Sequence, residues 1–90
     1  MIANQSVRED ITEVLEAAAP GILYTVFPTV YGRGGGDRKL GSVTWPETNF
    51  VLVAYTDTDS VDAVKRAVSA VKERFATEGI KLFIIADASV

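Results

Sequence analysis

The order of local patterns along the chain constrains its fold more than any other feature. Two segments space their apolar residues every three or four positions, as an amphipathic helix does. Three other segments are rich in the β-branched and aromatic residues that strands favour. The helical stripes consist of Val7, Ile11, Val14, Leu15 and Ala18, and of Val61, Val64, Val68, Val71 and Phe75. The sequence therefore predicts an α+β domain.

Residues that start and stop helices flank both stripes. Ser6-Val7-Arg8-Glu9 has the spacing of a capping box and predicts that the first helix begins after Ser6. Pro20 and Gly21 are expected to end this helix. Asp57-Thr58-Asp59-Ser60 is typical of a turn and N-cap. The second helix is then predicted to run from residue 61 to about Ala76, with Gly79 as its end signal.

The strand-like segments complete the pattern. They cover residues 22–31, 49–56 and 80–85, and Pro28 predicts an edge, a bulge or a bend because it cannot donate a ladder hydrogen bond. If Met1 to Gln5 adds a short first strand, the order becomes β-α-β-β-α-β. This order predicts a ferredoxin-like sandwich, an antiparallel sheet with two helices on one face.

One face of such a sheet has no helical cover. The segment 49–56 is apolar on both faces, which suits a central strand or one covered on its second face by another subunit. An open apolar face needs a partner. The sequence therefore predicts a homo-oligomer.

Composition excludes several classes of function. The 90 residues form one domain, 1–90, with a net charge of −3, which argues against non-specific binding to nucleic acid. The chain has no cysteine and no histidine, so disulfides, zinc-thiolate sites and Ser-His-Asp or Cys-His catalysis are excluded. No apolar run reaches the length of a membrane span and no signal-peptide pattern is present. We expect a cytoplasmic bacterial protein that does not insert into membranes.

A glycine-rich, cationic segment separates the second and third strands. Residues 32–49 are predicted to form a long loop, and its first part combines flexible glycines with basic side chains. Backbone N–H groups and guanidinium groups together make an anion site plausible, although the spacing is not that of a P-loop. A loop that is basic for solubility is an equal alternative. The candidate residues are Arg33, Gly34, Gly35, Gly36, Arg38, Lys39 and Gly41.

The single tryptophan follows this loop. Trp45-Pro46 is expected to cover a ligand or to pack in a subunit interface, and the interface is the favoured role because tryptophan is enriched there. Glu47 is a candidate for hydrogen bonding across the same cleft. The aspartates 57, 59 and 62 lack the glycine and twelfth-position glutamate of a calcium loop.

In this order and spacing the chain resembles the PII-like signalling proteins. Residues 27–34 are similar to the segment by which a strand of that superfamily enters its glycine turn. Residues 40–49 begin with Leu-Gly, continue with Trp-Pro and end with Asn. In this they resemble a segment of a poorly characterised PII-like branch. Residues 78–85 correspond to the glycine turn that leads into the fourth strand, which adds Gly79 and Lys81 to the candidate ligand residues.

The resemblance implies a homotrimer whose sheets pack around a central axis. It also implies clefts between subunits that bind an adenine nucleotide or a small anion, and a loop that responds to the ligand and contacts a target such as a transporter or an enzyme. No catalytic residue is implied, and the chain is expected not to be an enzyme. The loop is shorter than in well-characterised members, and after Arg74 the chain carries one basic residue, Lys81.

Three alternatives remain at this point. A trimeric metal-tolerance protein of the CutA type would share the same architecture, but the lack of histidine and cysteine counts against it. A small enzyme or haem-type dimeric α+β barrel is the second, but the absence of histidine removes the usual base and haem ligand. A structural trimer without a small ligand is the third.

Overall fold

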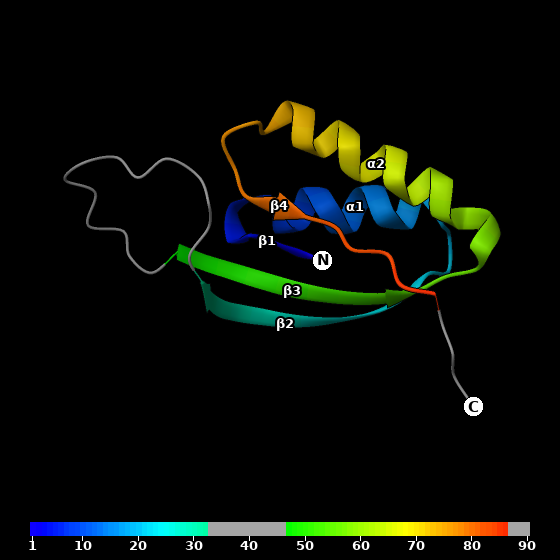
Figure 1. Cartoon of the computed structure of the whole chain (residues 1–90), viewed down its shortest axis with the longest axis horizontal. Helices are drawn as coiled ribbons and strands as arrows, with labels where there is room; N and C mark the ends of the chain where they lie inside the picture. Colours follow the sequence, from blue (N-terminus) through cyan, green and yellow to red (C-terminus); the bar gives the residue numbers. More distant parts are fainter. Residues whose placement is uncertain (33–46, 87–90) are drawn as a thin grey trace.

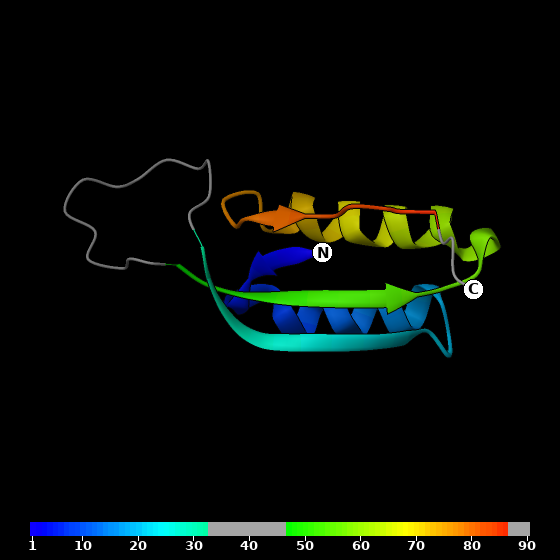
Figure 2. The same cartoon turned by 60° about the horizontal axis from the view of Figure 1, so that its bottom comes forward.

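The computed structural model describes residues 1–32 and 47–86. In chain order the elements are β1 (Ile2–Asn4), η1 (Gln5–Val7), α1 (Arg8–Ala18), β2 (Leu23–Gly32), β3 (Glu47–Tyr55), η2 (Thr58–Ser60), α2 (Val61–Arg74) and β4 (Ile80–Lys81). They form an antiparallel sheet of four strands in the order β2-β3-β1-β4 (Figure 1). Both helices lie on one face of this sheet (Figure 2). The α+β class is confirmed, and the arrangement is compatible with a ferredoxin-like fold.

The core lies between the helices and the sheet. The helical stripes predicted from spacing supply most of its helical side chains, because positions three and four apart share one face of a helix. Alternate residues of the strands complete the core from the sheet side. The buried residues are Ala3, Val7, Ile11, Leu15, Ala19, Phe50, Leu52, Val64, Val68, Val71 and Ile80.

The hairpin of β2 and β3 confirms the expectation drawn from Pro28. The antiparallel register is regular from Leu23↔Tyr55 to Phe27↔Val51, shifts, and resumes at Val30↔Asn49. The shift spans Pro28, whose missing N–H removes a ladder bond there. β3 lies between β2 and β1, the central position that its apolar sequence predicted.

The predicted capping box at Ser6 is wrong. The cap belongs to Asn4, whose side-chain Oδ1 accepts a hydrogen bond from the Ser6 N–H at 2.9 Å and starts η1. This short 3₁₀ turn carries the chain from β1 into α1, which begins at Arg8 without a side-chain cap. Asparagine is as good an N-cap as serine. Because Asn4 is the last residue of β1, its cap makes the 3₁₀ turn begin directly where the strand ends.

Other helix ends are close to their predictions. Gly21 has a φ of +82°, a left-handed conformation that glycine adopts without a Cβ clash, and it follows α1 as expected. Thr58–Ser60 of the turn predicted before α2 form η2. Neither Asp57 nor Ser60 makes a side-chain capping hydrogen bond. α2 ends at Arg74. Gly79 lacks a positive φ, and its carbonyl instead accepts the Asn4 N–H at 2.9 Å.

The last strand is much shorter than predicted. Only Ile80 and Lys81 of the expected segment 80–85 pair in the sheet. Their partner β1 offers only Ala3 and Ile2 to them, so the ladder ends where β1 ends.

Candidate functional site

The sheet face opposite the helices carries large apolar side chains that no part of residues 1–32 and 47–86 covers. Seen in Figure 2, this face is turned toward the viewer and the helices lie behind it. Leu23 and Tyr55 are 72% and 65% exposed, and Phe27 and Phe83 are 53% and 66% exposed. Exposed apolar patches of this kind usually mark interaction surfaces.

The strand register makes this face continuous. Phe27 lies opposite Val51, Val51 lies opposite Ile2, and Ile2 lies opposite Lys81, so one row crosses all four strands. A second row joins Leu23 to Tyr55. Opposite residues of neighbouring strands point to the same side and contact each other. We call this surface, formed by alternate residues of the strands, the open face.

Charge is almost absent from the open face. Lys81 is the one charged side chain that the described residues place there, whereas acidic and basic residues are concentrated on the helices. On the opposite side, Arg74 of α2 pairs with Asp10 of α1 at 3.5 Å. A charge-poor apolar centre is typical of interfaces between protein subunits.

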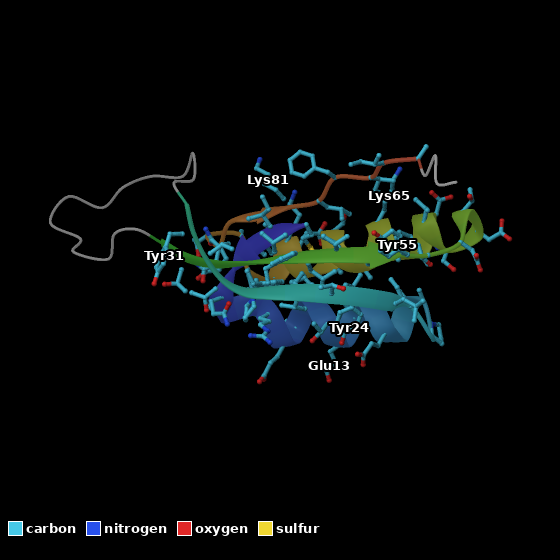
Figure 3. All side chains as sticks on the ribbon, turned by 90° about the horizontal axis from the view of Figure 1, so that it is seen from below. Glu13, Tyr24, Tyr31, Tyr55, Lys65 and Lys81 are labelled. Atoms are coloured by element: carbon cyan, nitrogen blue, oxygen red, sulfur yellow. The ribbon has the colours of Figure 1, made fainter. Side chains whose placement is uncertain are left out.

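The three tyrosines of the sheet differ in their environments. Tyr24 projects toward α1, where its hydroxyl donates a 2.7 Å hydrogen bond to Glu16 Oε1. That bond raises the pKa of Tyr24. Figure 3 shows Tyr31 and Tyr55 toward opposite ends of the sheet. Both are largely exposed, so packing against the described residues of the chain does not account for them.

Most of the ligand residues predicted from the sequence lie outside the described residues. These are Arg33, Gly34, Gly35, Gly36, Arg38, Lys39, Gly41 and Trp45. Glu47 is the first residue of β3, and its side chain also lies outside the described part of the structure. Gly79 lies just before β4, at the sheet end where β2 stops and β3 starts (Figure 1). Lys81 lies further along β4, with its side chain on the open face.

A polar recess beside α1 was not predicted. It has a volume of about 560 Å³ and lies between the start of the helix and β2. With its amide oriented for both bonds, Gln5 donates to the Pro28 carbonyl at 2.8 Å and accepts from Arg8 at 3.2 Å. Its walls are Gln5, Ser6, Arg8, Glu9, Asp10, Thr12, Tyr24 and Val26. Ser6, Arg8 and Glu9 were interpreted only as part of a helix start, and only the packing of β2 on α1 brings the residues of the recess together.

Metal ligands are not gathered anywhere in residues 1–32 and 47–86, since no group of three or more Asp or Glu side chains is placed to hold an ion there. Within the same part of the chain, no helix has the length and apolar character needed to cross a membrane. Comparison with protein-family models, with curated proteins and with solved structures finds no match to this chain.

Proposed function

We propose that this protein is a non-enzymatic, PII-like regulatory protein that assembles as a homotrimer through the open face. The observation that carries the proposal is the continuous, charge-poor apolar surface across β2, β3 and β1. The strand order β2-β3-β1-β4, with both helices on one face, supports the ferredoxin-like assignment on which the PII-like reading depends.

The area of the open face is adequate for assembly. An aromatic side chain buries about 150–250 Å² when it is fully covered. Phe27, Tyr55 and Phe83 are each more than half exposed, and three aliphatic residues lie beside them on the same face. Their exposed surface amounts to several hundred Å² by that scale, a large part of the roughly 800 Å² that each partner contributes to a typical stable interface.

The ligand part of the proposal depends on the sequence. Arg33, Arg38 and Lys39 among glycines favour a small anion or an adenine nucleotide as the signal, bound in clefts between subunits. Lys81, which the structure places on the open face, would bring a further positive charge to a neighbouring subunit. The loop 32–49 would then report occupancy to a target protein.

A structural trimer without a small ligand is the second candidate, and it shares the same supporting observation. The two differ only in their response to ligand. A CutA-type metal-tolerance protein is less favoured, because the chain offers no histidine or cysteine to bind copper or zinc.

Light scattering tests the assembly. We expect the wild-type protein to have the mass of three chains and Phe27→Asp to have the mass of one, because a carboxylate buried in the interface would be unpaired. Ala70→Asp, which places the same charge on an exposed position of α2, is the control and should remain trimeric. A trimeric Phe27→Asp would show that the open face is not the interface.

Thermal shift on the same samples tests the ligand. ATP, ADP, AMP, cyclic nucleotides and bicarbonate are added in turn, and one of them should raise the melting temperature of the wild type. The double variant Arg33→Ala/Arg38→Ala should lose this shift while keeping the melting temperature of the free protein. A trimer that responds to none of these compounds would favour the structural alternative.

A further inference from the structure

The polar recess beside α1 is fixed at both ends by hydrogen bonds between the helix side and β2. At one end, Gln5 donates to the Pro28 carbonyl at 2.8 Å. At the other, the Tyr24 hydroxyl donates to Glu16 Oε1 at 2.7 Å, and Figure 3 shows Tyr24 beside α1. Tyr24 and Pro28 stand about 13 Å apart along β2. The recess, of about 560 Å³, therefore has the size of a small-molecule site.

The walls between these two ends are mostly polar. Val26 lies midway between Tyr24 and Pro28 on β2, and it is the one aliphatic side chain among the described wall residues. The helix side contributes the hydroxyl groups of Ser6 and Thr12 together with charged side chains. Hydroxyl groups can both donate and accept hydrogen bonds. Such a lining suits a small polar ligand with a short apolar part.

Arg8 supplies the positive charge of the recess. Its guanidinium donates to the Gln5 side-chain oxygen at 3.2 Å, and Gln5 is itself bonded to β2, so the guanidinium is held in place. Within residues 1–32 and 47–86, no carboxylate forms an ion pair with it. The bond to Glu16 raises the pKa of Tyr24, and the positive charge of Arg8 partly opposes this rise. The remaining guanidinium N–H groups can bind a carboxylate through two parallel hydrogen bonds.

Glu9 supplies an opposite charge in the same recess. Consecutive residues of a helix do not face each other, and Glu9 and Arg8 form no ion pair. The other wall carboxylate, Asp10, pairs with Arg74 of α2 at 3.5 Å, whereas Glu9 has no such partner among the described residues.

This pair of charges selects among classes of ligand. A simple anion would be attracted to Arg8 but repelled by Glu9, and a simple cation would meet the reverse combination. A molecule that carries both charges can satisfy both side chains at once. The charges of the recess therefore favour a zwitterion over an anion or a cation of the same size.

We propose that the polar recess binds a small zwitterion of the amino-acid class, with its carboxylate on Arg8 and its ammonium group on Glu9. The hydroxyl groups of Ser6 and Thr12 provide further hydrogen bonds, and the short carbon chain of the ligand lies against Val26. A phosphate or a dicarboxylate would bring a second negative charge close to Glu9. This site is formed within one chain and uses none of the residues of the anion site proposed above.

Titrations followed by two-dimensional NMR test the ligand class. Glycine, γ-aminobutyrate and ε-aminocaproate are zwitterions of increasing length, whereas butyrate and butylamine each carry only one of the two charges. At least one zwitterion should shift the amide signals of Ser6, Thr12 and Val26 and saturate with a Kd of about 1 mM. Butyrate and butylamine should each bind about tenfold more weakly or worse.

Matched substitutions test the two charges. Arg8→Gln and Glu9→Gln should each weaken binding of that zwitterion about tenfold, because each removes one charged partner. Lys65→Gln and Glu73→Gln remove the same charges from exposed positions of α2 and should leave binding unchanged. A well-dispersed NMR spectrum of each variant shows that it is folded.

The absence of a saturable shift with all three zwitterions would overturn the proposal. Butyrate or butylamine binding as tightly as the zwitterions would reduce the recess to a site for a single charge and would also overturn it. So would an equal loss of binding in Arg8→Gln and Lys65→Gln, which would reflect only the overall charge of the protein. None of these results depends on the mass in solution or on nucleotide binding, so the outcome is separate from that of the proposed function.

Discussion

The two faces of the sheet are built from the same strands, but one face is buried and the other is exposed. In β3, Phe50 and Leu52 face the helices and are buried, whereas Val53 and Tyr55 face the other way and are exposed. Both sets are apolar. Alternation in a strand shows which residues share a face, but only the cover supplied by α1 and α2 decides which face becomes the core of a single chain.

Phe50→Ala should have the largest effect on stability of the substitutions to alanine. Phe50 is fully buried between sheet and helices, and truncating a buried phenylalanine costs about 3–5 kcal/mol of unfolding free energy. Urea denaturation measures the loss. Val53→Ala, on the other face of the same strand, is the control and should cost much less in a monomeric sample. Similar losses of unfolding free energy for both variants would show that the two faces contribute equally to the stability of the single chain.

Charge substitution sharpens the comparison. Val64→Asp places a carboxylate in the core and should unfold the chain, since an unpaired buried charge is strongly destabilising. Val53→Asp should keep the far-UV circular dichroism of the wild type but reduce the mass in solution to one chain. If Val53→Asp unfolds the protein as Val64→Asp does, the open face is part of the folding core.

Arg74→Ala should change stability by less than about 1 kcal/mol, because the ion pair with Asp10 is largely exposed. The expected loss should shrink further in 1 M salt, where charge interactions are screened. A double-mutant cycle with Asp10→Ala isolates the pair. A coupling of several kcal/mol would mean that the two helices depend on this contact rather than on the valine stripe.

The smallest expected effect comes from the Met1 amine. Its pKa in the folded chain lies below the ordinary value of 8.0, so the folded state holds this proton less tightly than the unfolded state does. Between the lowered folded pKa and about pH 8 the unfolded chain binds more protons, and stability therefore rises with pH across that window. Urea midpoints at pH 6, 7, 8 and 9 should show a small rise. The same chain with an acetylated amino end should lack it; an identical rise would place its origin elsewhere.

Sequence periodicity predicted the parts of the fold that depend on local pattern. Both helical stripes and the hairpin of β2 and β3 are confirmed, and the edge, bulge or bend predicted at Pro28 is found as a register shift, because each follows from side-chain spacing or from a missing N–H. The start of α1 was displaced from Ser6 by the cap at Asn4, a choice between two good capping residues that spacing alone does not decide.

The length of the last strand depended on contacts far along the chain. Residues 82–85 have strand-like composition, yet none of them pairs in the sheet, because β1 provides partners only for Ile80 and Lys81. The open face was predicted as a consequence of the sheet order. The polar recess at Gln5 and Arg8 could not be predicted, because its walls meet only after β2 packs on α1.

The measurement that tests the account most directly is the solution mass of the wild-type protein by light scattering, over a range of concentrations. Assembly through the open face predicts three times the chain mass of 9.7 kDa, with Phe27→Asp reduced to a single chain mass. A wild-type mass of one chain at every concentration would contradict it, because the exposed surface of Leu23, Phe27 and Tyr55 would then have no partner copy.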